Sequence, residues 1–167
     1  MGLDDLLGGG IRTGTIIDIF GSGGSGKTQL AMQISLNSLR DGTVLYQDAT
    51  GGFRPERMLQ LIKLQGLEPS LLDGMIVARM RNTSEQLDYV KKISEIKPQL
   101  VVIENITDLF TFEYSRDSSL LEKHVKFMQY MHDISMISIS AKVPIVVTNT
   151  IRNADGQEVE SLAKSIS

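Results

Sequence analysis

The sequence predicts an α/β protein with a parallel central sheet and helices on both faces. Short runs rich in Val and Ile alternate along the chain with longer segments of helical periodicity. The runs are continuously apolar, which indicates strands buried on both faces, and their alternation with helices implies parallel pairing through right-handed crossovers. With 167 residues, of which 41% are hydrophobic, the chain is long enough for a buried core. We therefore expect residues 1–167 to form one domain.

The first half of the chain contains two strand–helix pairs. TIIDIF (15–20) is an apolar, β-branched run and predicts a strand. Residues 27–40 carry apolar side chains at spacings of four and three, which predicts a helix buried on much of its surface. TVLYQD (43–48) predicts the second strand. Pro55 suits the first turn of the next helix, over residues 55–64, because that position needs no backbone N–H donor.

The second half continues the same alternation. MIVARM (75–80) predicts a strand, and residues 84–96 predict a helix from inward apolar positions three residues apart. LVVIEN (100–105) is an apolar strand that ends in a carboxylate. Residues 119–141 predict a long amphipathic helix, and PIVVTNT (144–150) predicts a fifth strand. Beyond this strand the pattern gives way to turn residues and a short helical stretch.

Composition excludes several classes of protein. The net charge is −3, from 17 basic and 20 acidic residues without a long run of one sign, so charge alone does not predict a general polyanion binder. The absence of Cys excludes disulfides and thiolate metal sites and is typical of a reducing compartment. No apolar run approaches the ~18–20 residues that a membrane span needs. The acidic start is unlike a secretory signal. We expect a cytoplasmic protein without a membrane partner.

A phosphate-binding motif follows the first strand. GSGGSGKT (21–28) fits the pattern G-x-x-x-x-G-K-[ST] and lies between a strand and a helix, the context that the motif requires. Glycines allow successive N–H groups to face an anion, and the helix N-terminus adds partial positive charge. We expect Lys27 to reach the terminal phosphates of ATP and Thr28 to hold Mg²⁺. The expected nucleotide contacts are Gly21, Ser22, Gly23, Gly24, Ser25, Gly26, Lys27, Thr28 and Gln29.

A second acidic motif ends the fourth strand. In LVVIE (100–104) an apolar strand terminates in Glu104, at the place where a carboxylate faces Mg²⁺ through water in many nucleotide-binding proteins. Asp is the usual residue there, and Glu is one methylene longer. A purely structural carboxylate is the alternative for Glu104. Asp108 is a less favoured substitute because it lies beyond the strand tip. Lys27 and Glu104 are the candidates for catalytic residues.

Several segments together resemble a known family. LDDLLGGGIRTGTIIDIFGSGGSGKTQL, YQDATGGFRPERM and VVIENITDLF are similar to the ATPase core of the RecA/RadA recombinases, including archaeal RadA and its paralogues such as RadB. ARMRNTSEQ (78–86) and VPIVVTNT (143–150) also resemble segments of that core. The resemblance covers nearly the whole chain and implies a RecA-like P-loop NTPase fold. GGFRPER is more specific than the phosphate loop, which unrelated enzymes share.

The resemblance also implies roles for individual residues. Arg57, at the end of FRPER, matches an arginine that stacks on adenine, a role that suits a planar guanidinium. Glu104 matches the Mg²⁺-associated aspartate. Residues 111–118 match a loop that contacts single-stranded DNA, where Tyr114 would stack on a base and Arg116 would meet a phosphate. A plain surface loop is the alternative, because acidic residues dilute its charge.

Three departures from the family pattern concern hydrolysis. The family's water-activating glutamate falls on Thr50, whose hydroxyl is no base near neutral pH. The Mg²⁺-associated aspartate is Glu104, and the glutamine that senses the terminal phosphate falls on Thr150. Binding elements are therefore intact while hydrolysis elements are altered. Asp48 remains able to recruit water, so slow hydrolysis stays open.

These observations predict an ATP-binding recombinase paralogue with an accessory role in DNA recombination and repair and weak or absent hydrolysis. The expected partners are ATP with Mg²⁺, single-stranded DNA and a recombinase or other repair protein. One alternative is an active DNA-dependent ATPase of the RecA family, and another is a KaiC-like signalling ATPase without a DNA role. The chain starts almost at the core and ends soon after the fifth expected strand. We therefore expect the C-terminal strands of the family to be missing.

Overall fold

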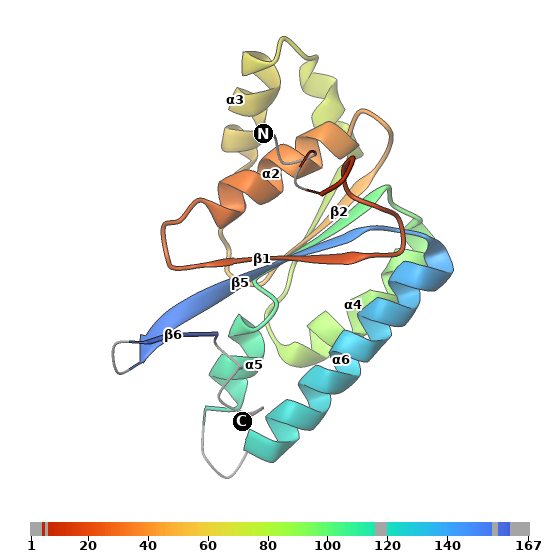
Figure 1. Ribbon diagram of the computed structural model, residues 1–167. Coiled ribbons are helices and arrows are strands. Elements are labelled where there is room, and N and C mark those ends of the chain that lie inside the picture. Colours follow the sequence, from red (N-terminus) through yellow and green to blue (C-terminus); the bar gives the residue numbers. More distant parts are fainter. Residues whose placement is uncertain (1–4, 6, 116–119, 155–156, 161–167) are drawn as a thin grey trace.

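A six-stranded sheet forms the centre of the molecule, as Figure 1 shows. The computed structural model describes residues 5, 7–115, 120–154 and 157–160. The main path of the sheet runs in the order β1-β5-β4-β2-β3, and β6 pairs with β5 beside this path. The strands are β1 (Ile16–Gly21), β2 (Val44–Asp48), β3 (Met75–Arg79), β4 (Leu100–Glu104), β5 (Ile145–Ala154) and β6 (Gln157–Glu160). The five strands of the main path are parallel, as the sequence predicts.

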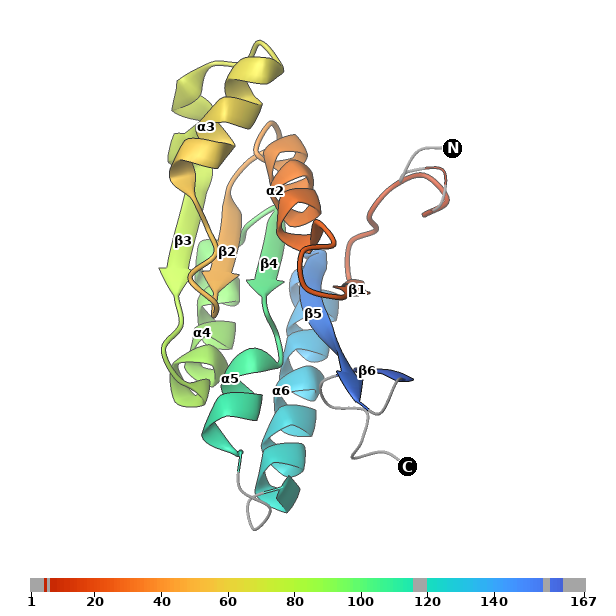
Figure 2. The same cartoon turned by 90° about the vertical axis from the view of Figure 1, so that its left-hand side faces the viewer.

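Helices cover both faces of the sheet. One face carries α2 (Lys27–Ser38), α3 (Pro55–Leu64) and the 3₁₀ helix η1 (Pro69–Gly74), and the opposite face carries α4 (Thr83–Ile96) and α6 (Leu120–Ala141). Figure 2 shows the short helix α5 (Asp108–Glu113) beyond the end of β4, beside α6. This is the predicted three-layer arrangement, and the expected RecA-like α/β class is confirmed. Helix α5 was not predicted.

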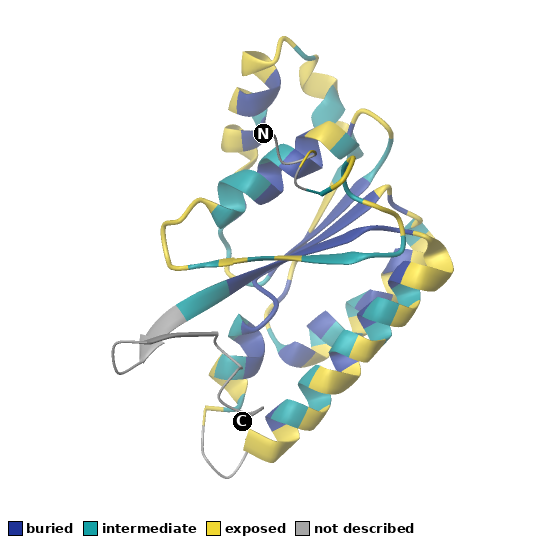
Figure 3. Ribbon diagram, in the orientation of Figure 1, coloured by how far each residue is buried: buried dark blue, intermediate teal, exposed yellow. Residues whose placement is uncertain are grey.

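The strands divide their side chains between two apolar cores. On β2, Val44 and Tyr46 belong to the core under α2 and α3, whereas Leu45 belongs to the core against α4 and α6. Figure 3 shows the resulting band of buried residues along the central strands. Both faces of β2 and β4 are packed, as their continuous apolar runs predict. The edge strands β1 and β3 are partly exposed, so the prediction of burial on both faces is wrong for them. Packing of the apolar side chains therefore determines on which face of the sheet the polar residues at the strand ends lie.

The C-terminal part of the sheet differs from the sequence prediction. The periodicity ended the fifth strand at Thr150, but β5 continues to Ala154 and pairs with β6 in an antiparallel ladder. The sequence did not predict this hairpin because its residues are largely polar and show neither hydrophobic periodicity nor an apolar run. Among the described residues, no helix has both the length and the apolar character that crossing a bilayer requires.

Candidate functional site

The predicted phosphate loop connects β1 with α2 at the carboxyl end of the sheet. Gly24 and Gly26 adopt φ values of +78° and +91°, a region that only glycine enters without strain. The ammonium of Lys27 donates hydrogen bonds to the carbonyl oxygens of Gly21 and Ser22, at 2.9 and 2.8 Å. The Lys27 ammonium is thus bound to the backbone of its own loop. An incoming phosphate would replace these carbonyl oxygens as the acceptor of its hydrogen bonds.

Two open cavities flank this loop. A cavity of about 330 Å³ lies on the α3 side and is lined by Lys27, Thr28 and Gln29 together with Arg54 and Arg57. The other, of about 450 Å³, lies on the β1 side and is lined largely by apolar side chains and the loop backbone. Lys27 lines both cavities. The first combines a phosphate loop with arginines, which suits a nucleoside triphosphate.

Arg57 lies at the rim of the first cavity, beside the start of α2. Its Nε donates to Gln29 Oε1 at 3.0 Å, and its Nη1 donates to Gln60 Oε1 at 3.1 Å. The guanidinium is exposed, so these bonds orient it without burying it. The structure thus brings together Arg57 and Gln29, two of the predicted nucleotide contacts.

Glu104 ends β4 beside the start of α2. The hydroxyl of Thr28 donates to its Oε1, and the phenol of Tyr46 donates to its Oε2. The carboxylate is buried, with 4% of the residue exposed. Desolvation by burial, together with the Glu104 charge and hydrogen bond, raises the pKa of Tyr46, so the phenol stays protonated and remains a donor. The structure therefore joins Thr28 and Glu104, as the sequence predicts.

The donors at this point fit Mg²⁺. A hydroxyl and a carboxylate are hard oxygen ligands, and Mg²⁺ typically takes only one or two protein ligands with nucleotide phosphates and water completing its shell. Among the described residues, no group of three or more His, Asp or Glu side chains is arranged to hold a metal ion alone. Thr28 and Glu104 would therefore hold Mg²⁺ only together with a nucleotide.

The turn between β2 and α3 is built on Asp48. Its Oδ1 accepts the backbone N–H groups of Thr50, Gly51 and Gly52, at 3.1, 2.6 and 3.1 Å. Its Oδ2 accepts the N–H of Phe53 at 3.2 Å. A carboxylate that accepts several backbone N–H groups is a strong local cap. Asp48 therefore has a structural role in the turn that the sequence did not predict.

Thr50 belongs to the same turn. Its hydroxyl donates to Asp48 Oδ1 at 3.2 Å and accepts the N–H of Gly52 at 3.1 Å. A hydroxyl with these two local partners supports the turn, and it has no carboxylate chemistry to offer. Thr50, which the resemblance places at the family's base, thus stabilises its own turn.

Arg79 covers this turn from the end of β3. Its Nη1 lies 3.5 Å from Asp48 Oδ2, and 56% of its side chain is exposed. A Cβ atom added to Gly51, whose φ is +75°, would lie 1.7 Å from the same nitrogen. The guanidinium therefore packs directly on the glycine backbone, although the ion pair itself is of the exposed kind that contributes at most about 1 kcal/mol.

A buried polar network joins the ends of β4 and β5. Asn105 donates to the Thr150 hydroxyl at 2.7 Å and accepts the N–H of Thr107 at 3.1 Å. The Thr107 hydroxyl lies 3.0 Å from Asn149 Oδ1. Thr150, which the resemblance places at the family's phosphate sensor, is therefore hydrogen-bonded to Asn105.

The segment expected to contact DNA begins inside α5. Tyr114 follows the helix and is partly buried, and Lys126 of α6 donates to its hydroxyl at 2.6 Å and also lies over its ring, 5.1 Å from the centroid. Phe112, in contrast, is 81% exposed. Glu113 accepts the N–H and hydroxyl of Thr83, at 2.8 and 2.5 Å, which fixes α5 to the start of α4. Arg116 lies outside the described residues.

Comparisons with known proteins agree with this geometry. The Rad51 family model matches residues 1–165. The chain belongs to the Rad51 family. It is 35% identical over 158 residues to the DNA repair and recombination protein RadB of Pyrococcus abyssi, covering 90% of this chain and 68% of that protein. It is 30% identical over 167 residues to RadB of Pyrococcus horikoshii, covering 98% of this chain and 70% of that protein.

Archaeal RadA proteins of the same family are also similar. The DNA repair and recombination protein RadA of Cenarchaeum symbiosum is 34% identical over 164 residues, which cover 91% of this chain and 41% of that protein. The corresponding RadA of Metallosphaera sedula is 35% identical over 162 residues, or 89% of this chain and 50% of that protein. The chain thus spans about half the length of these RadA relatives.

Three residues at or beside the candidate site were missed in the sequence. Tyr46 was seen only as part of an apolar strand, although it lies two residues before Asp48 and so shares its face of the sheet. Arg79 ends a neighbouring strand, and Asn105 directly follows Glu104. Polar residues at the carboxyl ends of parallel strands were the available signal, because ligands bind at that edge of open α/β sheets.

Proposed function

We propose that this chain binds Mg-ATP at the loop 21–28, hydrolyses it weakly or not at all, and has an accessory role in DNA recombination and repair. Thr28 lines the cavity beside the phosphate loop, and its hydroxyl donates to Glu104 directly behind it. Membership of the Rad51 family, and the similarity to the DNA repair and recombination proteins RadA and RadB, support the recombination role.

One observation carries the proposal of weak hydrolysis. The position of the family's base holds Thr50, and its hydroxyl is bonded to Asp48 and to the turn backbone. General-base catalysis typically contributes ~10²–10⁴ in rate, and a threonine supplies none of it near neutral pH. Nucleotide would thus be held by an intact binding surface that lacks the group to activate water.

The remaining carboxylates give an active ATPase less support. Asp48 already accepts hydrogen bonds from four backbone N–H groups. Glu104 accepts a hydroxyl on each oxygen. A general base needs an oxygen that is free to accept a proton from water. In both carboxylates the oxygens already accept hydrogen bonds from other groups of the protein. Slow turnover would have to displace these contacts.

Single-stranded DNA is the proposed macromolecular ligand, through the segment 111–118. Tyr114 would stack on a base only after leaving the ammonium of Lys126, whereas exposed Phe112 offers its ring directly. Arg116 would contact a phosphate. A recombinase or another repair protein is the proposed protein partner, in line with the names of the relatives.

The experiment combines nucleotide binding and turnover on one purified sample. Calorimetry with Mg-ATP is expected to give saturable binding that Lys27→Ala removes, and hydrolysis is expected to stay slow with and without single-stranded DNA. Unchanged affinity in Lys27→Ala would contradict the site. Brisk hydrolysis by the unaltered chain would contradict the lost base, and Asp48→Asn and Glu104→Gln would then identify the working carboxylate.

A second arm measures binding to single-stranded DNA at several salt concentrations. Phosphate contacts give an affinity that falls with salt, with a slope set by their number. Such a slope supports the recombination role. No binding at low salt, with or without nucleotide, would favour a signalling role without DNA.

A further inference from the structure

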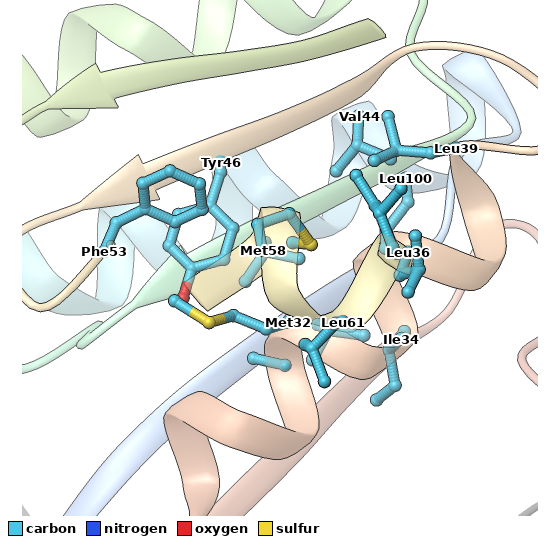
Figure 4. Close-up of a cluster of buried hydrophobic side chains, with 14 residues drawn as sticks. Met32, Ile34, Leu36, Leu39, Val44, Tyr46, Phe53, Met58, Leu61 and Leu100 are labelled. Atoms are coloured by element: carbon cyan, nitrogen blue, oxygen red, sulfur yellow. The ribbon is translucent and has the colours of Figure 1, made fainter. Parts of the chain in front are cut away.

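Tyr46 reaches the candidate Mg²⁺ site from inside the core. It lies on β2, between β4 and the edge strand β3, and none of its surface is exposed. Its ring packs against Phe53, with centroids 4.9 Å apart, and Figure 4 shows both rings in the core beside Met32 and Met58. The phenol is the polar end of this buried side chain, and it donates to Glu104 Oε2.

The register of the sheet explains this contact. Asp48 on β2 is paired with Glu104 on β4, so Tyr46, two residues earlier, lies on the same face as Glu104 and diagonal to it. Diagonal neighbours are within reach of long and aromatic side chains. Thr28, at the start of α2, approaches the other oxygen of the same carboxylate. Glu104 is therefore clamped between a hydroxyl from the loop side and a phenol from the core.

The length of Glu104 makes the clamp necessary. Glu has one more rotatable bond than Asp, and an unrestrained carboxylate would lose rotamer freedom when it is fixed on a metal. A carboxylate shortened by one methylene retreats by about 1.5 Å, one C–C bond. It would then fail to reach Tyr46 and Thr28 together. The longer side chain of Glu104 is thus what allows its carboxylate to bind the Tyr46 phenol and the Thr28 hydroxyl at the same time.

We propose that Tyr46 is a positioning residue for the Mg²⁺-nucleotide site, and that it holds Glu104 so that its other oxygen faces Thr28 and the metal. This inference rests on the proposed binding of Mg-ATP. It predicts that Glu104→Asp, which introduces the residue usual at this place, weakens Mg²⁺-dependent binding because Asp does not reach the phenol.

The test is a double-mutant cycle between Tyr46→Phe and Glu104→Asp, read as ATP affinity by calorimetry with Mg²⁺ and with EDTA. Each single change is expected to weaken Mg²⁺-dependent binding about tenfold, the usual size for one hydrogen bond to a charged acceptor. The double variant is expected to lose about tenfold as well, because both changes remove one contact. Without Mg²⁺ all four proteins should bind alike.

Tyr130→Phe is the matched control. Tyr130 is also fully buried, but its hydroxyl is directed to Gln47 on the other side of the sheet. It should change nucleotide affinity less than about twofold, because it does not touch the site. Thermal unfolding of every variant checks that it folds. Should Tyr46→Phe fail to fold, Glu104→Asp alone decides, since affinity equal to that of the unaltered chain would overturn the proposal.

The outcomes separate this inference from the proposed function. No Mg-ATP binding by the unaltered chain would remove both. If the unaltered chain binds Mg-ATP but the double variant loses about a hundredfold in affinity, the two changes are independent. That result would overturn the proposed role of Tyr46 and leave the proposed function standing. A loss in Tyr46→Phe that is the same with and without Mg²⁺ would likewise overturn the proposed role and assign Tyr46 a packing role.

Discussion

Replacing Asp48 by Ala tests whether this carboxylate stabilises the turn after β2 or takes part in catalysis. The change removes the acceptor of four backbone N–H groups, of which only that of Phe53 is buried. A buried donor left unsatisfied costs about 1–3 kcal/mol. Water can replace Asp48 at the more exposed donors, so these add only about 1 kcal/mol together. We expect a total loss of about 3 kcal/mol in the free energy of unfolding.

Urea unfolding followed by circular dichroism measures this loss. For a chain of this size, a loss of about 3 kcal/mol lowers Tm by about 6–12 °C. Asp48→Asn keeps one acceptor oxygen, so we expect roughly half the effect. Asp73→Ala, at an exposed carboxylate on η1, is the control and should stay within about 0.5 kcal/mol. A loss below about 1 kcal/mol in Asp48→Ala would refute the structural role. Lost hydrolysis with unchanged stability in Asp48→Asn would assign Asp48 to catalysis.

Four further predictions follow from the site and its neighbours. Gly51→Ala should destabilise the fold by about 1–2 kcal/mol because φ at this residue is +75°. Adding Arg79→Ala should restore little of this stability, and denaturant unfolding of the single and double variants checks both expectations. Thr50→Glu should raise single-turnover hydrolysis only about tenfold, because Glu104 and Thr150 also depart from the family pattern; a gain of about a thousandfold would mean that the base was the only missing element. Lys27→Ala should abolish ATP binding in calorimetry, since the ammonium is the charge on the phosphate loop, and retained affinity would move the site elsewhere. Phe112→Ala should weaken binding to single-stranded DNA by ~1–3 kcal/mol in a fluorescence titration, and more than Tyr114→Ala; the reverse order would show that Tyr114 leaves Lys126 on binding.

Local patterns were sufficient to predict the five parallel strands, the four major helices and the position of the glycine-rich loop between β1 and α2. Each of these five strands contained a short apolar run, and each major helix had its own periodicity, so neither needed information from another part of the chain. The motif at 21–28 was recognisable because its residues are consecutive and lie between one strand and one helix. The hairpin of β5 and β6 was missed because antiparallel pairing of polar residues leaves no such pattern.

The sequence by itself determined that the chain has this α/β order of elements, a glycine-rich loop before α2 and a threonine where the family resemblance implies a base. Only the tertiary structure decided what surrounds those residues. Asp48 became the acceptor of the turn, and Glu104 was clamped by Thr28 and Tyr46. The contacts of Glu104 join β4 to residues of β2 and α2 that lie 58 and 76 positions earlier in the chain. Strand order and register bring them together, and hydrophobic periodicity encodes which face of a strand is buried but not which strand becomes its neighbour.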